Sequence, residues 1–204
     1  MFALVESGTI TQFPKGNKGI TIGDNQYPKT IYSLWTEAER NAIGIYTVTI
    51  DNTNKKNEEF WINTDITYTF TGSAVTGSYG TATAKRLNDE NAVDEDGNNV
   101  LDADGNQVIN YGLKTQFKNE FNAEAAGMLS RTDWYVIKAA DVTDYNVPSN
   151  ITTYRAAVRT KVNAMETSID NCSDVDALIT LLTYTTDSEG VTSRPLGEFP
   201  DEVV

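Results

Sequence analysis

The apolar residues of this chain change their spacing near Gly112, and this change constrains the fold more than any other feature. Up to residue 84, β-branched and aromatic residues alternate with polar ones, as in Phe60–Phe70. This alternation is typical of half-buried β-strands. After Gly112, apolar residues recur about every four positions, which is typical of helices that pack along one face. The sequence therefore predicts an α+β protein in which a β-rich N-terminal module precedes a helical module.

Composition divides the chain into four parts. We expect a β-rich N-terminal module over residues 1–84 and an acidic linker with hairpin turns over residues 85–111. A helical module of three to four helices follows over residues 112–184, and residues 185–204 are expected to form an extended, poorly regular tail. The pattern leaves open whether the two modules share one core.

The N-terminal module is expected to contain antiparallel strands and one short helix. Alternation and turn residues predict strands at residues 2–6, 9–13, 44–51, 58–64, 66–71 and 75–79. Because one set of alternating residues is polar, we expect a sheet with one covered face. Thr36 and Glu39 have the spacing of a capping box, which predicts a short helix that ends at Ala42.

The helical module is expected to begin just after Gly112, with an apolar stripe formed by Leu113, Phe117, Phe121, Ala125 and Leu129. Thr132 is expected to cap a second, short helix. Pro148 precedes a long third helix, whose apolar face predicts a core formed by Tyr154, Val158, Val162, Met165 and Ile169. Asp174 is expected to cap a fourth helix.

Charge and composition exclude several classes of function. Sixteen basic and twenty-nine acidic residues give a net charge of −13, which repels nucleic acid and anionic membranes. The chain has no histidine, so histidine-dependent catalysis and most transition-metal sites are excluded. The single cysteine, Cys172, is expected to be a small buried or capping residue. We assign no catalytic residue, no metal ligand and no cofactor, and we expect a non-enzymatic protein without nucleic-acid or membrane partners.

The N-terminal residues lack the pattern of a signal peptide, and no apolar run reaches the length of a membrane span. A soluble protein made in the cytoplasm is therefore expected.

Two acidic segments, Asp94–Asn98 and Asp102–Asn106, repeat at a spacing of eight residues. A calcium-binding loop of the EF-hand type needs carboxylates at its first and last positions around a fixed glycine. In both possible frames these positions hold Ala, Val or Tyr. We therefore interpret the repeat as two Asp-Gly turns joined by a short strand at residues 99–101.

One segment resembles a known family. The sequence Leu129-Ser-Arg-Thr-Asp-Trp134 is followed by Pro148, by Tyr154-Arg-Ala-Ala-Val-Arg159 and, near the end, by Phe199-Pro200. These features resemble the tail-fibre assembly or tail assembly chaperone-like proteins of tailed bacteriophages, over roughly residues 128–200. The resemblance implies a non-enzymatic chaperone that binds tail or tail-fibre subunits in the host cytoplasm during assembly.

Trp134, Arg155 and Arg159 are the candidate partner-binding residues. Trp134 either anchors a partner or fills the gap between the second and third helices, and we favour the structural role because large aromatic side chains are usually buried. Arg155 and Arg159 either line a groove for an acidic partner or pair locally with Asp133 or Asp141.

A second class of function stays open. The Thr-, Gly- and Asn-rich strands and the Asp-Gly turns also suit a permanent virion protein of the tail, such as a fibre, adaptor or baseplate-associated component. An enzyme ranks third. Paired carboxylates such as Glu58 and Glu59 are expected to lie on a solvated surface, not to converge in a catalytic cleft.

Overall fold

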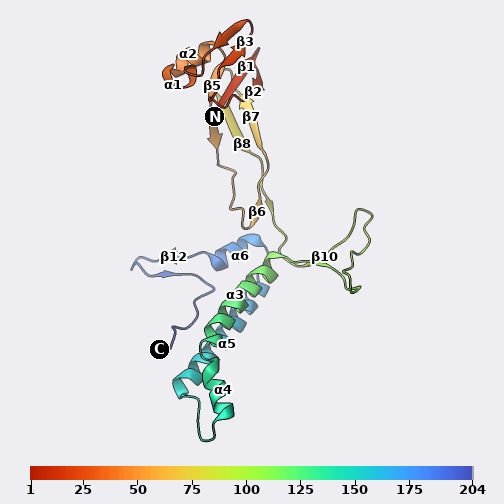
Figure 1. Cartoon of the computed structure of the whole chain (residues 1–204), viewed down its shortest axis with the longest axis vertical. Coiled ribbons are helices and arrows are strands. Elements are labelled where there is room, and N and C mark those ends of the chain that lie inside the picture. Colours follow the sequence, from red (N-terminus) through yellow and green to blue (C-terminus); the bar gives the residue numbers. More distant parts are fainter. Residues whose placement is uncertain (204) are drawn as a thin grey trace. The chain divides into compact units, whose positions relative to one another are not determined.

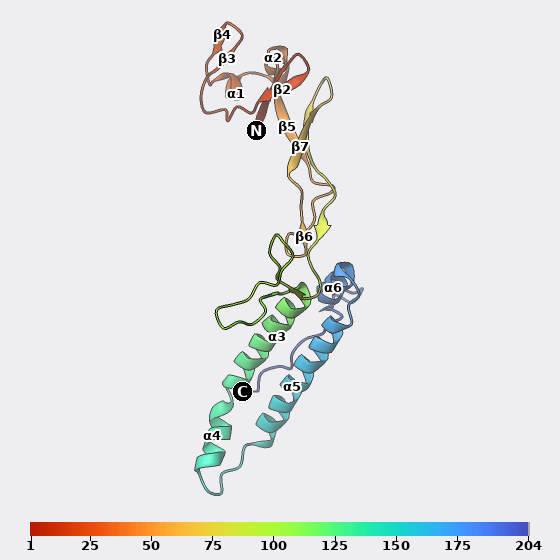
Figure 2. The same cartoon turned by 90° about the vertical axis from the view of Figure 1, so that its right-hand side faces the viewer.

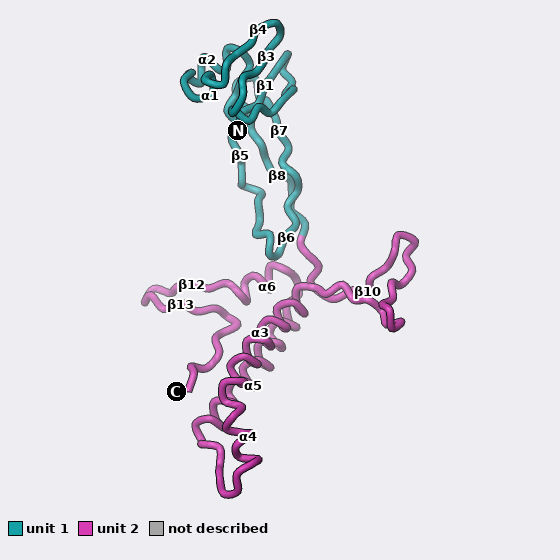
Figure 3. The backbone as a smooth tube through the Cα atoms, viewed as in Figure 1, with its two compact units in different colours: residues 1–83 teal, residues 84–204 magenta. Residues whose placement is uncertain are grey.

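The computed structural model describes residues 1–203, which form an α+β chain as the sequence predicts (Figure 1). The chain divides into two compact units, Met1–Thr83 and the residues from Ala84 onward (Figure 3). The first unit contains most of the strands, and the second contains the long helices. The acidic hairpins and the C-terminal segment both belong to the second unit.

The first unit is built on a five-stranded sheet with the strand order β2-β1-β5-β8-β7. These strands are β1 (Phe2–Glu6), β2 (Thr9–Gln12), β5 (Ile45–Asp51), β7 (Ile66–Phe70) and β8 (Val75–Tyr79). Their positions confirm the strands that alternation predicts. The expected antiparallel pairing holds for β1–β2, β1–β5 and β7–β8, but it is wrong for β5 and β8, which are parallel. The long connection after β5 leads first to the edge strand β7, and the β7–β8 hairpin then places β8 beside β5.

One face of this sheet is covered by two short helices and a hairpin. The covering elements are α1 (Ile31–Leu34), α2 (Glu37–Ala42), β3 (Ile20–Ile22) and β4 (Asn25–Tyr27). The buried residues of this cluster are Leu4, Ile20, Ile31, Tyr32 and Ile45. The predicted capping box of α2 is confirmed, because Glu39 N donates to Thr36 Oγ1 and Thr36 N donates to the Glu39 carboxylate.

The opposite face of the sheet is also buried at β1, β5 and β8, which corrects the expectation of one covered face for these strands. The core residues of this face are Ala3, Val5, Val48 and Val75. In β7 the expectation holds, because Thr67 and Thr69 are exposed while the residues between and beside them are half-buried. The sheet curls so that its edge strands β2 and β7 approach each other. Phe13, just after β2, and Tyr68 of β7 have ring centroids 4.6 Å apart. This curvature lets the sheet cover its own inner face with aromatic side chains.

The remaining strands near the unit boundary are short. The predicted strand at residues 58–64 is reduced to β6 (Trp61–Ile62), and β9 (Thr83–Ala84) lies at the boundary between the units.

The second unit is organised around two long helices that run antiparallel side by side in both views (Figures 1 and 2). Its helices are α3 (Leu113–Ser130), α4 (Asp133–Asp141), α5 (Ser149–Asp170) and α6 (Val175–Leu182), which confirms the four predicted helices. The core between them consists of Leu113, Phe121, Ala125, Ile151, Tyr154, Val158, Val162, Met165, Ile169, Val175 and Leu178. Asp174 caps α6 as expected, since its carboxylate accepts a 2.8 Å hydrogen bond from Ala177 N.

The acidic segment folds as the two predicted Asp-Gly turns, between β10 (Glu90–Asn91) and β11 (Ile109–Asn110). Asp94 and Asp102 each accept hydrogen bonds from backbone amides two and four residues later. These bonds lower the pKa of both carboxyl groups below the ordinary value of 3.8. The expected strand at residues 99–101 is present only as isolated bridges at its two ends.

The C-terminal segment has more structure than the expected extended tail. It contains a small hairpin of β12 (Thr185–Thr186) and β13 (Thr192–Ser193). Leu196 is buried, its amide donates to Leu181 O, and its carbonyl accepts a 2.7 Å hydrogen bond from Lys161 Nζ on α5. The segment is therefore packed against the helices of its own unit.

Candidate partner-binding surface

The two halves of the sequence motif meet at the turn between α3 and α4. Thr132, a polar residue that is only 5% exposed, donates a 2.9 Å hydrogen bond to Leu129 O. Arg155 Nη1 on α5 donates to Leu129 O at 2.8 Å and to Thr132 Oγ1 at 2.7 Å. The same nitrogen lies 2.8 Å from the Asp133 carboxylate. These contacts tie the α3–α4 turn to α5, and we call this group of four residues the Arg155 clamp.

The Arg155 clamp decides between two sequence-based alternatives. Arg155 forms the local pair with Asp133, and its side chain is only 11% exposed. It therefore positions the turn rather than presenting its charge to a partner. Thr132 occupies the N-cap position of α4, but its side chain makes no capping hydrogen bond. The predicted cap is wrong because the Thr132 hydroxyl is used by Leu129 and Arg155.

Tyr154, beside Arg155, belongs to the helical core as predicted and is 4% exposed. Its hydroxyl has no hydrogen-bond partner within the described residues. Burial raises the pKa of this phenol, and the nearby Glu202 carboxylate raises it further, so the group is neutral at physiological pH. Glu202 also pairs with Arg131, which brings the C-terminal segment to the same corner of the unit.

Trp134 is 51% exposed, so the favoured expectation that it fills the gap between two helices is wrong. Its indole ring lies against Tyr135 with ring centroids 3.7 Å apart, and Lys138 Nζ lies 5.9 Å from its centroid. The reason for the exposure is that α5 packs along α3, while α4 extends beyond this contact and buries none of its residues. The Trp134 side chain is therefore available to another molecule.

The exposed apolar side chains of α4 and the residue after it form what we call the α4 surface: Trp134, Val136, Ile137 and Val142. Trp134 and Ile137 are one helical turn apart, so they share a side of α4. Ile137 is 61% exposed. Clustered exposed apolar residues mark interaction sites more often than scattered ones do. The sequence did not single out Ile137 as a binding residue, although its three-residue spacing from Trp134 was a usable signal. Val136 lies two residues from Trp134 and therefore points to another side of α4.

A small cavity of about 260 Å³ adjoins the α4 surface and is lined by Val136, Val147, Thr152, Arg155 and Arg159. Arg159 is exposed, and its only hydrogen bond within the described residues is a 3.5 Å contact from Nη1 to Arg155 O. It has no ion pair with any carboxylate of residues 1–203, so neither Asp133 nor Asp141 neutralises it. Of the two candidate arginines, Arg159 is therefore the one whose charge faces solvent at this cavity.

Among the described residues there is no metal-binding cluster, and the cysteine thiol is buried. Within residues 1–203, no three His, Cys, Asp or Glu side chains are grouped so that they could hold a metal ion. Cys172 is buried, as expected, and burial raises the pKa of its thiol, which disfavours the nucleophilic thiolate. In the same part of the chain, no helix has the length and apolarity to cross a membrane.

Comparisons with protein-family models, curated proteins and solved structures find no match to this chain. The chemistry of the α4 surface therefore rests on its own geometry. That surface combines a half-exposed tryptophan with aliphatic side chains, and Arg159 of α5 lines the cavity beside Val136.

Proposed function

We propose that this chain is a bacteriophage tail or tail-fibre assembly protein, a non-enzymatic chaperone that binds tail or fibre subunits through its α4 surface. The resemblance of residues 129–134 and 154–159 to tail assembly chaperone-like proteins supports the bacteriophage class. The observation that carries the proposal is that α4 buries none of its residues and exposes Trp134 and Ile137. Such a protein works by binding, so it needs no catalytic group.

The composition of the α4 surface suits an anchor for a protein partner. Tryptophan and arginine dominate the energetics of protein interfaces because they combine large apolar area with directional polar contacts. The Arg155 clamp holds α4 in place before a partner arrives, which reduces the entropy lost on binding. Trp134 and Ile137 would supply the apolar contact, and Arg159 would bind a carboxylate of the partner.

The proposed action is transient. An unassembled fibre or tail subunit exposes apolar surface and strand edges that favour aggregation. A chaperone that covers this surface stabilises the free subunit by mass action. When the subunit forms its own oligomer, the same surface becomes buried there and the chaperone is released.

The test is affinity capture after co-expression of this chain with each tail or fibre subunit encoded beside its gene. We expect one subunit to be captured by the wild-type chain and lost from a Trp134→Ala, Ile137→Ala double variant. Leu34→Ala is the matched control, since Leu34 is a 77% exposed apolar residue of the first unit. Capture that survives in a folded double variant would contradict the role of the α4 surface.

A permanent virion component of the tail is the second candidate. The observation that favours it is another set of exposed apolar side chains on the acidic hairpins, where Val93 and Leu101 are each 56% exposed. Two separate apolar surfaces suit a protein that joins two neighbours in an assembled particle. The composition of purified particles distinguishes this candidate from the chaperone.

A further inference from the structure

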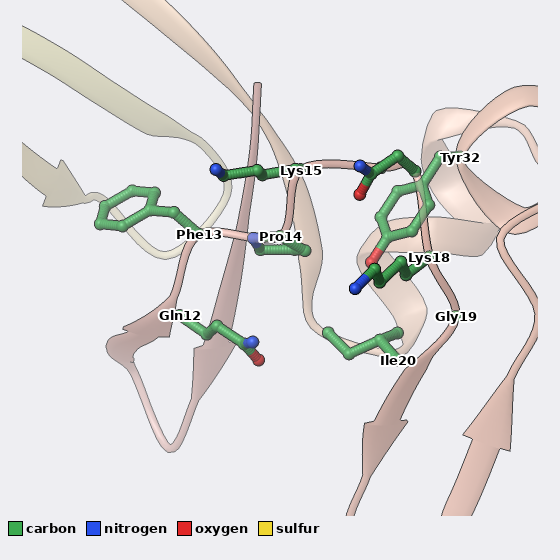
Figure 4. Close-up of a pocket in the computed structure, with 10 residues that line it drawn as sticks. Gln12, Phe13, Pro14, Lys15, Lys18, Gly19, Ile20 and Tyr32 are labelled. Carbon is green, nitrogen blue, oxygen red and sulfur yellow. The ribbon is translucent and has the colours of Figure 1, made fainter.

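The first unit contains a cleft that plays no part in the proposed function. Its volume is about 490 Å³, and it is lined by residues 12–20 and by Tyr32 (Figure 4). Residues 13–19 form the loop between β2 and β3, and Tyr32 comes from α1. This loop, Phe13-Pro-Lys-Gly-Asn-Lys-Gly19, is basic and rich in glycine in a chain whose net charge is −13.

Hydrogen-bond donors at this cleft are numerous and unused. Lys15 and Lys18 have no ion pair and no hydrogen bond within the described residues. The backbone amides from Lys15 to Gly19 donate no hydrogen bond to another backbone group of residues 1–203. None of the lining residues is an Asp or Glu. The cleft is therefore lined by two lysines and by a loop whose backbone N–H groups have no acceptor within residues 1–203.

Tyr32 adds a buried donor at the wall of the cleft. The residue is 9% exposed, and its hydroxyl has no hydrogen-bond partner in the described structure. Burial raises the pKa of this phenol, so it remains protonated and able to donate. The centroids of the Tyr32 and Phe2 rings are 4.9 Å apart, and this contact holds the Tyr32 ring in place. A buried hydroxyl without a partner is unfavourable, and an oxygen atom of a bound ligand would remove that penalty.

The backbone of the loop also favours an anion. Gly16 has a φ of +74°, a left-handed conformation that glycine adopts without strain. A side chain at this position would have its Cβ 3.4 Å from the Phe2 ring and 3.6 Å from that of Tyr32. Gly16 therefore lies directly against these two rings at the wall of the cleft, and its positive φ is what favours glycine there. Exposed backbone N–H groups beside a left-handed residue are a recurrent means of binding phosphate groups.

We propose that this cleft binds a compact oxyanion of the phosphate class, either free phosphate or the phosphate of a small phosphorylated molecule. Lys15 and Lys18 supply positive charge, and the amides of Lys15–Gly19 together with the Tyr32 hydroxyl supply hydrogen bonds. Phe13, which is 40% exposed, offers an apolar surface beside the anion. A phosphorylated ligand would place its organic part against this ring.

The test is a nuclear magnetic resonance titration of the full ¹⁵N-labelled chain with inorganic phosphate, with glucose 6-phosphate and with glucose. We expect saturable shifts of the Lys15–Gly19 amides with both phosphates and none with glucose. Tighter binding of glucose 6-phosphate identifies a phosphorylated molecule as the ligand, whereas equal binding identifies free phosphate. Absence of a saturable shift at these amides with either phosphate overturns the proposal.

Variants separate this site from general charge attraction. Because charge-assisted hydrogen bonds are the strong ones, Lys15→Gln with Lys18→Gln is expected to weaken phosphate binding by roughly tenfold or more. Lys55→Gln with Lys56→Gln makes the same change of charge outside the cleft and is expected to leave binding unchanged. Tyr32→Phe is expected to weaken binding about threefold without lowering the thermal midpoint, because its hydroxyl has no partner in the free protein. The proposed site would be contradicted if the two lysine double variants lost the same phosphate affinity. It would also be contradicted if Tyr32→Phe bound phosphate as tightly as the wild type.

Discussion

Arg155 reaches from α5 to the α3–α4 turn, where its Nη1 donates a 2.7 Å hydrogen bond to the hydroxyl of Thr132. Twenty-three residues separate the two in the sequence. The same guanidinium binds Leu129 O and the Asp133 carboxylate. The Leu-x-x-Thr-Asp-Trp and Tyr-Arg segments are therefore parts of a single structural unit. This unit directs α4 away from the helical core and leaves Trp134 exposed.

Thr132→Val is expected to destabilise the helical unit by about 1–3 kcal/mol, because it removes the hydroxyl but keeps the shape and takes one acceptor from the partly buried Arg155. Urea unfolding followed by circular dichroism measures the change. Thr132→Ser keeps the hydroxyl and is the matched control. If the Thr132→Val and Thr132→Ser variants lose the same free energy of unfolding, the hydrogen bond to Arg155 contributes nothing to stability.

Trp134→Ala is expected to change the free energy of unfolding by less than about 1 kcal/mol, because the side chain is half exposed and fills no core. Met165→Ala is the comparison, since Met165 is fully buried in α5 and its truncation is expected to cost about 2–5 kcal/mol. Both values come from the same denaturant titrations. If the Trp134 variant loses as much free energy of unfolding as the Met165 variant, Trp134 acts as a core residue.

Local patterns predicted most of the secondary structure. Alternation located β1, β2, β5, β7 and β8 to within a residue or so, and the Thr36 capping box located α2. The β3–β4 hairpin was missed, although Gly23-Asp24 between two short runs is a recognised two-residue turn signal. Polar residues in β4 hid the alternation there.

Long-range pairing and exposure could not be predicted in the same way. Alternation identifies β5 and β8 as strands, but it does not show which strands are neighbours or in which direction they pair. Their parallel pairing was therefore missed. The exposure of Trp134 depends on where α3 and α5 stop packing against each other. The spacing of apolar residues within α4 carries no information about that contact. The choice of Asp133 as the partner of Arg155 was left open for the same reason, because it depends on how the α3–α4 turn meets α5.

Gly77→Ala is expected to destabilise the first unit by about 1–3 kcal/mol through overpacking. A Cβ at this position would lie 2.8 Å from Ile66 Cγ2 and from Tyr68 Cε1, and 2.9 Å from Ile50 Cδ1. Gly127→Ala in α3 is the matched control, since no atom lies within 4 Å of its added Cβ, and it is expected to stabilise by about 0.5–1 kcal/mol. Thermal unfolding of the two variants checks the opposite signs. A neutral or stabilising Gly77→Ala would mean that the inner face of the sheet is loosely packed.

The Asp174 cap of α6 predicts how the stability of the fold changes with pH. Hydrogen bonds from Ala177 N and Ser173 lower the pKa of Asp174 below 3.8, so its contribution to folding is complete above that value. The contribution is lost as the pH falls through the lower pKa of the folded state. Asp174→Asn keeps a neutral cap, so we expect it to be less stable than wild type at neutral pH and to lose this difference in acid. Thermal midpoints measured across the acidic range test this, and a difference that stays constant with pH would contradict it.

Quantitative mass spectrometry tests most directly the proposal that the chain assists assembly and is then released. Peptides of this chain are measured in purified intact phage particles and in lysates of infected cells from the same culture. We expect abundant peptides in the infected cells and none at the stoichiometry of a tail component in the particles. Peptides retained in the particles at that stoichiometry would contradict the chaperone and make the chain a structural component of the tail.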